Sequence, residues 1–111
     1  MTTAMYAHPN QIDHKRIERA LAQRERYRYV MPRVIADEEE HGYRIESPCC
    51  SRNVEPQGGN IDIALLKYFK PHWLLYRKDH IYSAWALHSV VDTLQAALGI
   101  LLPDEERIFW P

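Results

Sequence analysis

The sequence predicts a two-layer α+β domain, with a helix at each end and an about five-stranded, mostly antiparallel meander sheet between them. Three observations lead to this fold class. The 111 residues fit one domain, and a hydrophobic content of 46% is typical of a globular protein. Three Trp, seven Tyr and two Phe supply ring surface that favours a sheet. The central apolar segments follow one another after short turns, which requires antiparallel neighbours.

The chain is expected to begin with a flexible arm over residues 1–9, followed by a single domain over residues 10–111. Asn10 is suited to be a helix N-cap, and Asp13 stands three residues later, in a variant of the capping box. Apolar residues then recur at helical spacing. We therefore predict a helix over residues 11–23.

Alternating or continuously apolar segments predict the strands. Pro32 cannot donate to a ladder, so the first strand should be an edge strand. Residues 39–42 should form a hairpin turn in which Gly42 supplies a positive φ. Residues 60–69 are apolar through most of their length and should form a central strand with both faces covered. The predicted strands cover residues 26–31 with 33–37, then 43–47, 60–69, 73–78 and 81–88.

The C-terminal helix is predicted to start at Ser89, with Asp92 closing a second variant capping box. Pro103 should end it. The last residues, 108–111, are apolar enough to dock on the core. The apolar face of this helix is predicted to consist of Val91, Leu94, Ala97, Leu98 and Leu101.

Several of these segments together resemble a family of small bacterial proteins known only as a domain of unknown function. They are Arg-Ile-Glu-Arg at 16–19, Ile-Ala-Leu-Leu-Lys-Tyr at 63–68, Trp-Leu-Leu-Tyr-Arg-Lys-Asp at 73–79, the capped last helix, and Ile-Phe-Trp at 108–110. The resemblance spans about residues 12–110 and implies the same fold, but no activity. The chain departs from the family pattern at residues 47–54, where it carries a cysteine pair.

The composition favours a cytoplasmic protein without a membrane partner. The N-terminal sequence has no apolar core of a signal peptide, and no run approaches the ~20 apolar residues that span a bilayer. Net charge is −1, so no global attraction to polyanions is expected. The charge is nevertheless uneven, because seven basic residues lie within residues 15–33 and five acids within residues 37–46.

A basic-aromatic segment is the first candidate site. Interleaved Arg and Tyr side chains can pair phosphates and stack bases, which suggests nucleic acid or another anionic partner. In the alternative interpretation, the Tyr side chains are core and the Arg side chains are solvated and paired with the acids of residues 37–40. The candidate partner-binding residues are Arg24, Arg26, Tyr27, Arg28, Tyr29 and Arg33.

The adjacent cysteines, Cys49 and Cys50, are the second candidate site. Thiolates bind soft metals such as zinc and are redox-active, and His80 is the imidazole assigned to such a site. Asp62, His72 and His88 are further ligands if the fold brings them near. Zinc sites usually use a Cys-x₂-Cys spacing, so two structural thiols are the alternative.

No catalytic residue is predicted. The pair Asp79-His80 has no matched nucleophile, and Gly58-Gly59 lacks the surroundings of a phosphate loop. We therefore expect a non-enzymatic binding or regulatory module that acts through the basic-aromatic segment. An exposed edge strand would also allow pairing with a protein partner or with a second copy of the chain. The alternative is a metal-binding or redox-sensing thiol site.

Overall fold

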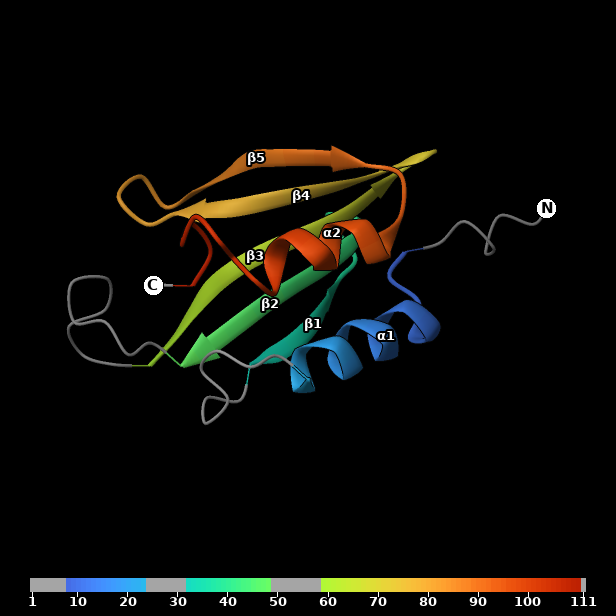
Figure 1. The fold of residues 1–111 in the computed structure, drawn as a ribbon, viewed down its shortest axis with the longest axis horizontal. Coiled ribbons are helices and arrows are strands. Elements are labelled where there is room, and N and C mark those ends of the chain that lie inside the picture. Colours follow the sequence, from blue (N-terminus) through green and yellow to red (C-terminus); the bar gives the residue numbers. More distant parts are fainter. Residues whose placement is uncertain (1–7, 24–31, 49–58, 111) are drawn as a thin grey trace.

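The computed structural model describes residues 8–23, 32–48 and 59–110. It confirms the α+β fold class: in chain order, one helix comes first, the five strands follow, and a second helix comes last (Figure 1). Among the described residues, no helix is long and apolar enough to cross a bilayer. The elements are α1 (Gln11–Ala22), β1 (Arg33–Asp37), β2 (Gly42–Pro48), β3 (Asn60–Phe69), β4 (His72–Asp79), β5 (Ala84–Val91) and α2 (Leu94–Leu101).

The sheet is the predicted meander. Its five strands lie in the order β1-β2-β3-β4-β5, and each neighbouring pair is antiparallel. β1 and β5 are therefore the two edges, as expected for a strand that directly follows Pro32. The stretch 26–31, predicted to extend the first strand, lies outside the described residues.

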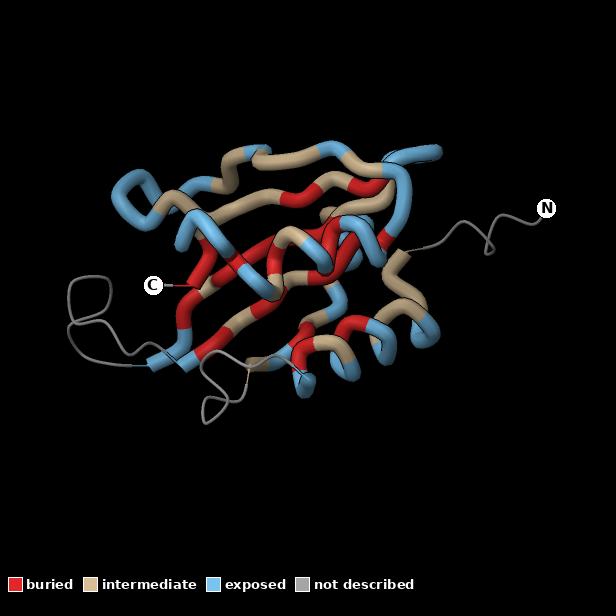
Figure 2. Tube along the Cα trace, in the orientation of Figure 1, coloured by how far each residue is buried: buried red, intermediate tan, exposed pale blue. Residues whose placement is uncertain are grey.

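Both helices lie over the same side of the sheet (Figure 1). A single core cluster joins Ile17 of α1 and Leu101 of α2 to Tyr43 and Ile45 of β2, all of them fully buried. The burial colouring shows this core along the middle of the sheet and the inner sides of the helices (Figure 2). The other side of the sheet, called the open face below, carries no described helix.

The central strand β3 is buried on both faces, as predicted. Leu65 and Leu66 are consecutive, so their side chains point to opposite faces, and they are 1% and 0% exposed. Leu66 belongs to the core under the helices, opposite Tyr43. Leu65 lies on the open face between Arg44 and Tyr76, which cover it from the neighbouring strands.

The predicted N-cap of α1 is confirmed. The Asn10 side-chain oxygen accepts a hydrogen bond from the Asp13 backbone N–H at 2.8 Å, and its amide donates to the Asp13 carboxylate at 3.2 Å. Two polar groups at the start of the helix are thereby paired.

The N-cap predicted for the second helix was wrong. Thr93, rather than Ser89, caps α2, and its hydroxyl accepts a hydrogen bond from the Ala96 N–H at 3.0 Å. The reason is that β5 continues further than predicted, so that Ser89 and Val91 pair with β4 and are part of the sheet.

The start of β5 was also predicted too early. Residues 80–83 form a turn, and the strand begins at Ala84. The Asp79 carboxylate accepts hydrogen bonds from the N–H groups of Ile81 and Tyr82, which holds these residues in the turn.

Gly42 is required for a different reason from the one predicted. The positive φ of the β1–β2 turn, 55°, belongs to His41. A Cβ on Gly42 would lie 2.1 Å from the backbone oxygen of Leu66. Glycine is therefore needed because β2 approaches the backbone of β3 closely at this point.

The C-terminal segment docks on the core, as predicted. Phe109 and Trp110 are 3% and 6% exposed. The buried Asp104 carboxylate accepts hydrogen bonds from the N–H groups of Ile108, Phe109 and Trp110. One carboxylate thus satisfies the backbone of a segment that has no regular structure.

Gly42→Ala should lower the free energy of unfolding by about 3 kcal/mol, because the new methyl group meets backbone that cannot move aside. Gly99→Ala is the matched control, since no atom lies within 4 Å of the Cβ it would add to α2. That substitution should raise stability by up to about 1 kcal/mol through helix propensity. Urea denaturation measures both changes, and equal effects of the two substitutions would contradict the close-approach argument.

Candidate functional site

The open face carries an ion-pair network on β1, β2 and β3. Arg44 donates hydrogen bonds to Asp62 at 2.8 Å and to Glu46, and its guanidinium lies 3.9 Å from Asp37. Arg33 pairs with Glu46 at 2.9 Å. Burial disfavours the charge on Arg44, but the hydrogen bonds to Asp62 and Glu46 outweigh it and raise the pKa of the guanidinium. The network is thus a set of mutually neutralised charges.

Towards β4 and β5 the same face becomes more apolar. The Lys78 ammonium lies 3.4 Å from Asp62 and 4.7 Å from the ring centroid of Trp85. Leu87 lies opposite Tyr76 and is 53% exposed. Val90, on the same edge strand, is equally exposed.

The basic-aromatic candidate residues Arg24, Arg26, Tyr27, Arg28 and Tyr29 lie outside the described residues. They belong to the connection between α1 and β1. The remaining member, Arg33, is the first residue of the edge strand β1, and its side chain is 65% exposed even though it pairs with Glu46.

The candidate thiols, Cys49 and Cys50, also lie outside the described residues. Pro48, which precedes them, pairs with Asn60 at one end of the sheet. His80 lies at this end, close enough to Asp62 for the carboxylate to affect its pKa. Burial, and then the charge of Lys78, lower the pKa of His80. The charges of Asp62 and Asp79 oppose this decrease in part.

The other two histidines considered as ligands lie elsewhere. His72, at the opposite end of β4, lies 3.3 Å from the Asp92 carboxylate, and His88 faces a separate cavity. Among residues 8–23, 32–48 and 59–110, no group of three or more metal-ligating side chains is found.

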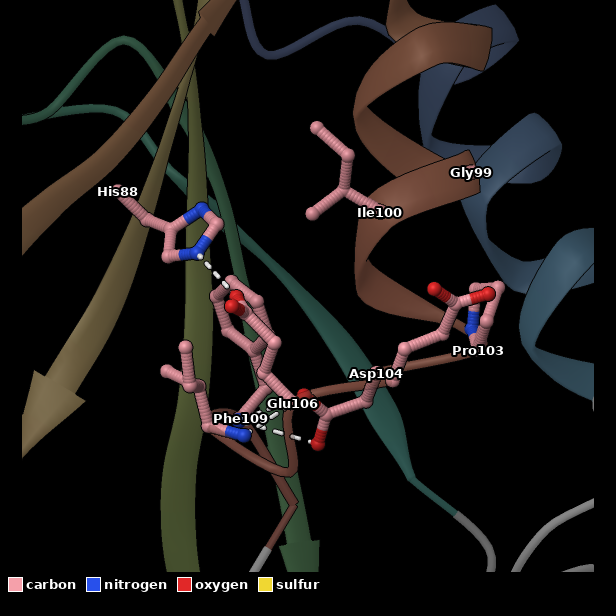
Figure 3. Close-up of a pocket in the computed structure, with 9 residues that line it drawn as sticks. His88, Gly99, Ile100, Pro103, Asp104, Glu106 and Phe109 are labelled. Atoms are coloured by element: carbon pink, nitrogen blue, oxygen red, sulfur yellow. Dashed lines mark hydrogen bonds and ion pairs between the residues drawn. The ribbon is translucent and has the colours of Figure 1, made fainter.

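The cavity beside His88 has a volume of about 320 Å³ and lies between β5, α2 and the C-terminal segment (Figure 3). The His88 ring packs 5.0 Å from that of Phe109, and its Nε2 lies 3.9 Å from the Glu106 carboxylate. Its Nδ1 lies 2.5 Å from the Ser89 hydroxyl. Ser89 does not line the cavity, so this hydroxyl is not presented to a molecule bound there.

Sequence reasoning did not identify His88 as a cavity residue. Leu75 of β4 pairs with Ser89 and Tyr76 pairs with Leu87, so His88 is the extra residue of a β-bulge. A bulge re-aims side chains, and nothing in the residue pattern predicts where it occurs.

A second feature missed by sequence reasoning is an aromatic cage formed by Tyr43, Tyr68 and Trp73. These residues come from β2, β3 and β4. The His8 ring lies inside the cage, with its centroid 5.9, 4.8 and 5.1 Å from those of Tyr43, Tyr68 and Trp73. His8 stands at the end of the predicted arm, where no sequence signal indicated a fixed contact.

The fully buried Tyr43 hydroxyl receives its hydrogen-bond partners from residues that precede α1. It lies 2.8 Å from His8 Nδ1 and accepts a hydrogen bond from the Asn10 backbone N–H at 2.8 Å. The Asn10 side-chain amide also lies 3.3 Å from His8 Nδ1. The Asn10 amide nitrogen can only donate, so Nδ1 is the acceptor in this contact and the His8 ring is neutral.

The pKa values of this cluster follow from burial. Burial lowers the pKa of His8, and Asp13 opposes this effect only in part. Burial raises the pKa of Tyr43 to about 12. The hydrogen bond from the Asn10 N–H opposes this increase in pKa, and the negative charge of Asp13 adds to it. Both groups are therefore held in their neutral forms.

The lowered pKa of His8 makes stability depend on pH. The unfolded chain takes up a proton near pH 6.5 whereas the folded chain does so only at lower pH. The stability that neutral, buried His8 contributes is therefore complete above pH 6.5. It is lost as the pH falls through 6.5 towards the pKa of His8 in the folded chain. Denaturation between pH 7.5 and 5 should show wild type losing more stability than His8→Gln. An unchanged profile for His8→Gln would contradict this assignment.

Comparison with known proteins gives a family without an assigned activity. Residues 5–111 match the family model described as a domain of unknown function, DUF3024. No curated protein and no solved structure matches the chain.

Proposed function

The chain belongs to the DUF3024 family, a domain of unknown function, and we propose that it is a non-enzymatic binding module for an anionic partner, specifically nucleic acid. The proposed contact surface is the basic strip, which we define as Arg24, Arg26, Arg28 and Arg33 with Tyr27 and Tyr29. Arginines would pair phosphates, and the tyrosines would stack on bases.

The observation that carries this proposal is that acids of residues 37–46, called the acidic block here, form ion pairs with cations of the sheet. In the described residues Asp37 lies near Arg44, Glu40 pairs with Lys67 at 3.1 Å, and Glu46 pairs with Arg44 as well as Arg33. These acids are mainly occupied by cations of the sheet. The alternative, in which the acidic block neutralises the whole basic block, is correspondingly weakened.

The helix before the strip adds basic surface. Lys15, Arg16 and Arg19 are exposed on α1, and α1 contacts the edge strand β1. Arg16 pairs with Asp13 at 3.2 Å, and Glu18 lies 3.5 Å from His14. Helix, connection and strand start therefore form a continuous stretch of chain with an excess of positive charge.

The proposal predicts salt-sensitive binding of single-stranded oligonucleotides. Fluorescence anisotropy with a labelled 20-mer should show saturable binding at 20 mM salt that weakens steeply by 200 mM, because bound counterions are released. Replacing Arg24, Arg26 and Arg28 together by Gln should reduce affinity at least tenfold and flatten the salt dependence.

The matched control replaces three other cations, Lys70, Arg77 and Arg107, by Gln, and should change affinity less than threefold. Absence of binding at 20 mM salt would refute the nucleic-acid proposal. Sedimentation of the same samples tests the other class of partner: a dimer that binds no oligonucleotide, and that Leu87→Lys with Val90→Lys dissociates, would move the contact surface to β5.

A thiol site at Cys49 and Cys50 is the second candidate function. It is supported by the position of Pro48, after which the chain leaves the sheet at the end where Asp62 and His80 lie. Zinc bound by the two thiolates with His80 would use ligands that suit this ion. A redox-sensing pair without metal is the other form of this candidate.

Native mass spectrometry of untagged protein, purified without chelator or added metal, tests the zinc form. The expected result is an added mass of one zinc ion that disappears when Cys49 and Cys50 are both replaced by Ser, and is reduced in His80→Ala. His72→Ala, at the other end of β4, should keep the metal. A bare mass for the wild-type protein would reject zinc binding.

A further inference from the structure

The aromatic cage has walls that do not depend on its occupant. Tyr68 and Trp73 are direct partners across β3 and β4, and Tyr43 stacks on Trp73 with centroids 6.1 Å apart. Trp73 and Tyr43 are 7% and 0% exposed and belong to the core. The sheet itself therefore holds the three rings in place.

The occupant, by contrast, belongs to no helix or strand. His8 precedes α1, and its side chain contacts the three rings, the Tyr43 hydroxyl and the Asn10 amide. Its ring nitrogen also lies 3.7 Å from the Asp13 carboxylate. The contacts of His8 are thus made by its side chain. Rotation of the short backbone segment before Asn10 can move this side chain out of the cage.

The chemistry of the cage suits a cation better than the neutral ring inside it. Three aromatic rings within 6 Å and a carboxylate at the rim attract positive charge through the ring quadrupoles and by Coulomb interaction. An imidazolium would lose the hydration of its N–H groups on entering, and the Asn10 amide nitrogen, which can only donate, already lies 3.3 Å from Nδ1 of His8. A quaternary, fully methylated ammonium has a diffuse, weakly hydrated charge and no N–H group to leave unpaired, so it enters at lower cost.

We propose that the cage of Tyr43, Tyr68 and Trp73 is a binding site for a quaternary, fully methylated ammonium group, and that His8 is its displaceable intramolecular occupant. This proposal does not depend on the proposed function, because it uses none of the residues of the basic strip. Ligand binding would release the segment before α1, because ligand and imidazole compete for the same space.

The test uses tetramethylammonium chloride as the probe and the indole N–H signal of Trp73 as the readout in two-dimensional NMR. Sodium chloride of equal concentration corrects for ionic strength. His8→Ala should bind the probe at least tenfold more tightly than wild type, because the intramolecular competitor has been removed. Tyr68→Leu in the His8→Ala background should lose binding, whereas His72→Ala should behave as wild type.

Uncharged tert-butanol, which has a similar shape, separates a cation site from an apolar hole. It should bind His8→Ala at least tenfold more weakly than tetramethylammonium. Equal binding of the two probes would overturn the proposal, as would equal affinity of wild type and His8→Ala for the cation. A folded His8→Ala protein that binds neither probe would overturn it too.

A measurement on the wild-type protein keeps the proposal testable if His8→Ala does not fold. Saturation with tetramethylammonium should expel His8 and return its pKa to the ordinary range, as followed by the carbon-bound proton shifts of the ring. An unchanged His8 titration at saturating probe would refute displacement.

Discussion

A phenol buried completely near the start of β2 imposes a strong constraint on this fold. The Tyr43 ring is core, but its hydroxyl needs partners inside the protein, since an unpaired buried polar group costs about 1–3 kcal/mol. In the part of the chain that the structure describes, they come from His8 and from the Asn10 backbone, and the Asn10 side chain in turn starts α1. This hydroxyl therefore ties the residues that precede α1 to the sheet, in addition to the core contacts of Ile17 and Leu21.

One-sided packing explains the rest of the surface. With both helices on one face, alternate residues of every strand must face outward on the other. On β1 and β2 these positions hold ions, which the antiparallel register places opposite or diagonal to each other, as for Arg33 and Glu46. On β5 they hold the half-exposed Leu87 and Val90. The network around Arg44 thus gives one half of the open face a covering of charged side chains that are paired with one another.

The sequence predicted the features that depend on local pattern. Strand alternation, the Asn10 cap, the central strand β3 and the docked C-terminus follow from periodicity, capping chemistry and hydrophobicity, and the structure confirms them. The predicted cap at Ser89 failed because Ser89 pairs with Leu75 and stays in β5, so that Thr93 caps the helix instead. The His8 cage and the bulge at His88 arise from contacts between segments distant in sequence, which no local pattern encodes.

The distribution of charge along the chain also follows from strand geometry. The acids of residues 37–46 stand in or beside a hairpin, where period-two alternation lets them meet cations of the sheet on one face. The basic residues before Arg33 stand ahead of the first ladder pair, between Arg33 and Glu46. In a chain whose net charge is −1, three of the five acids of residues 37–46, namely Asp37, Glu40 and Glu46, are thereby paired with cations of the sheet.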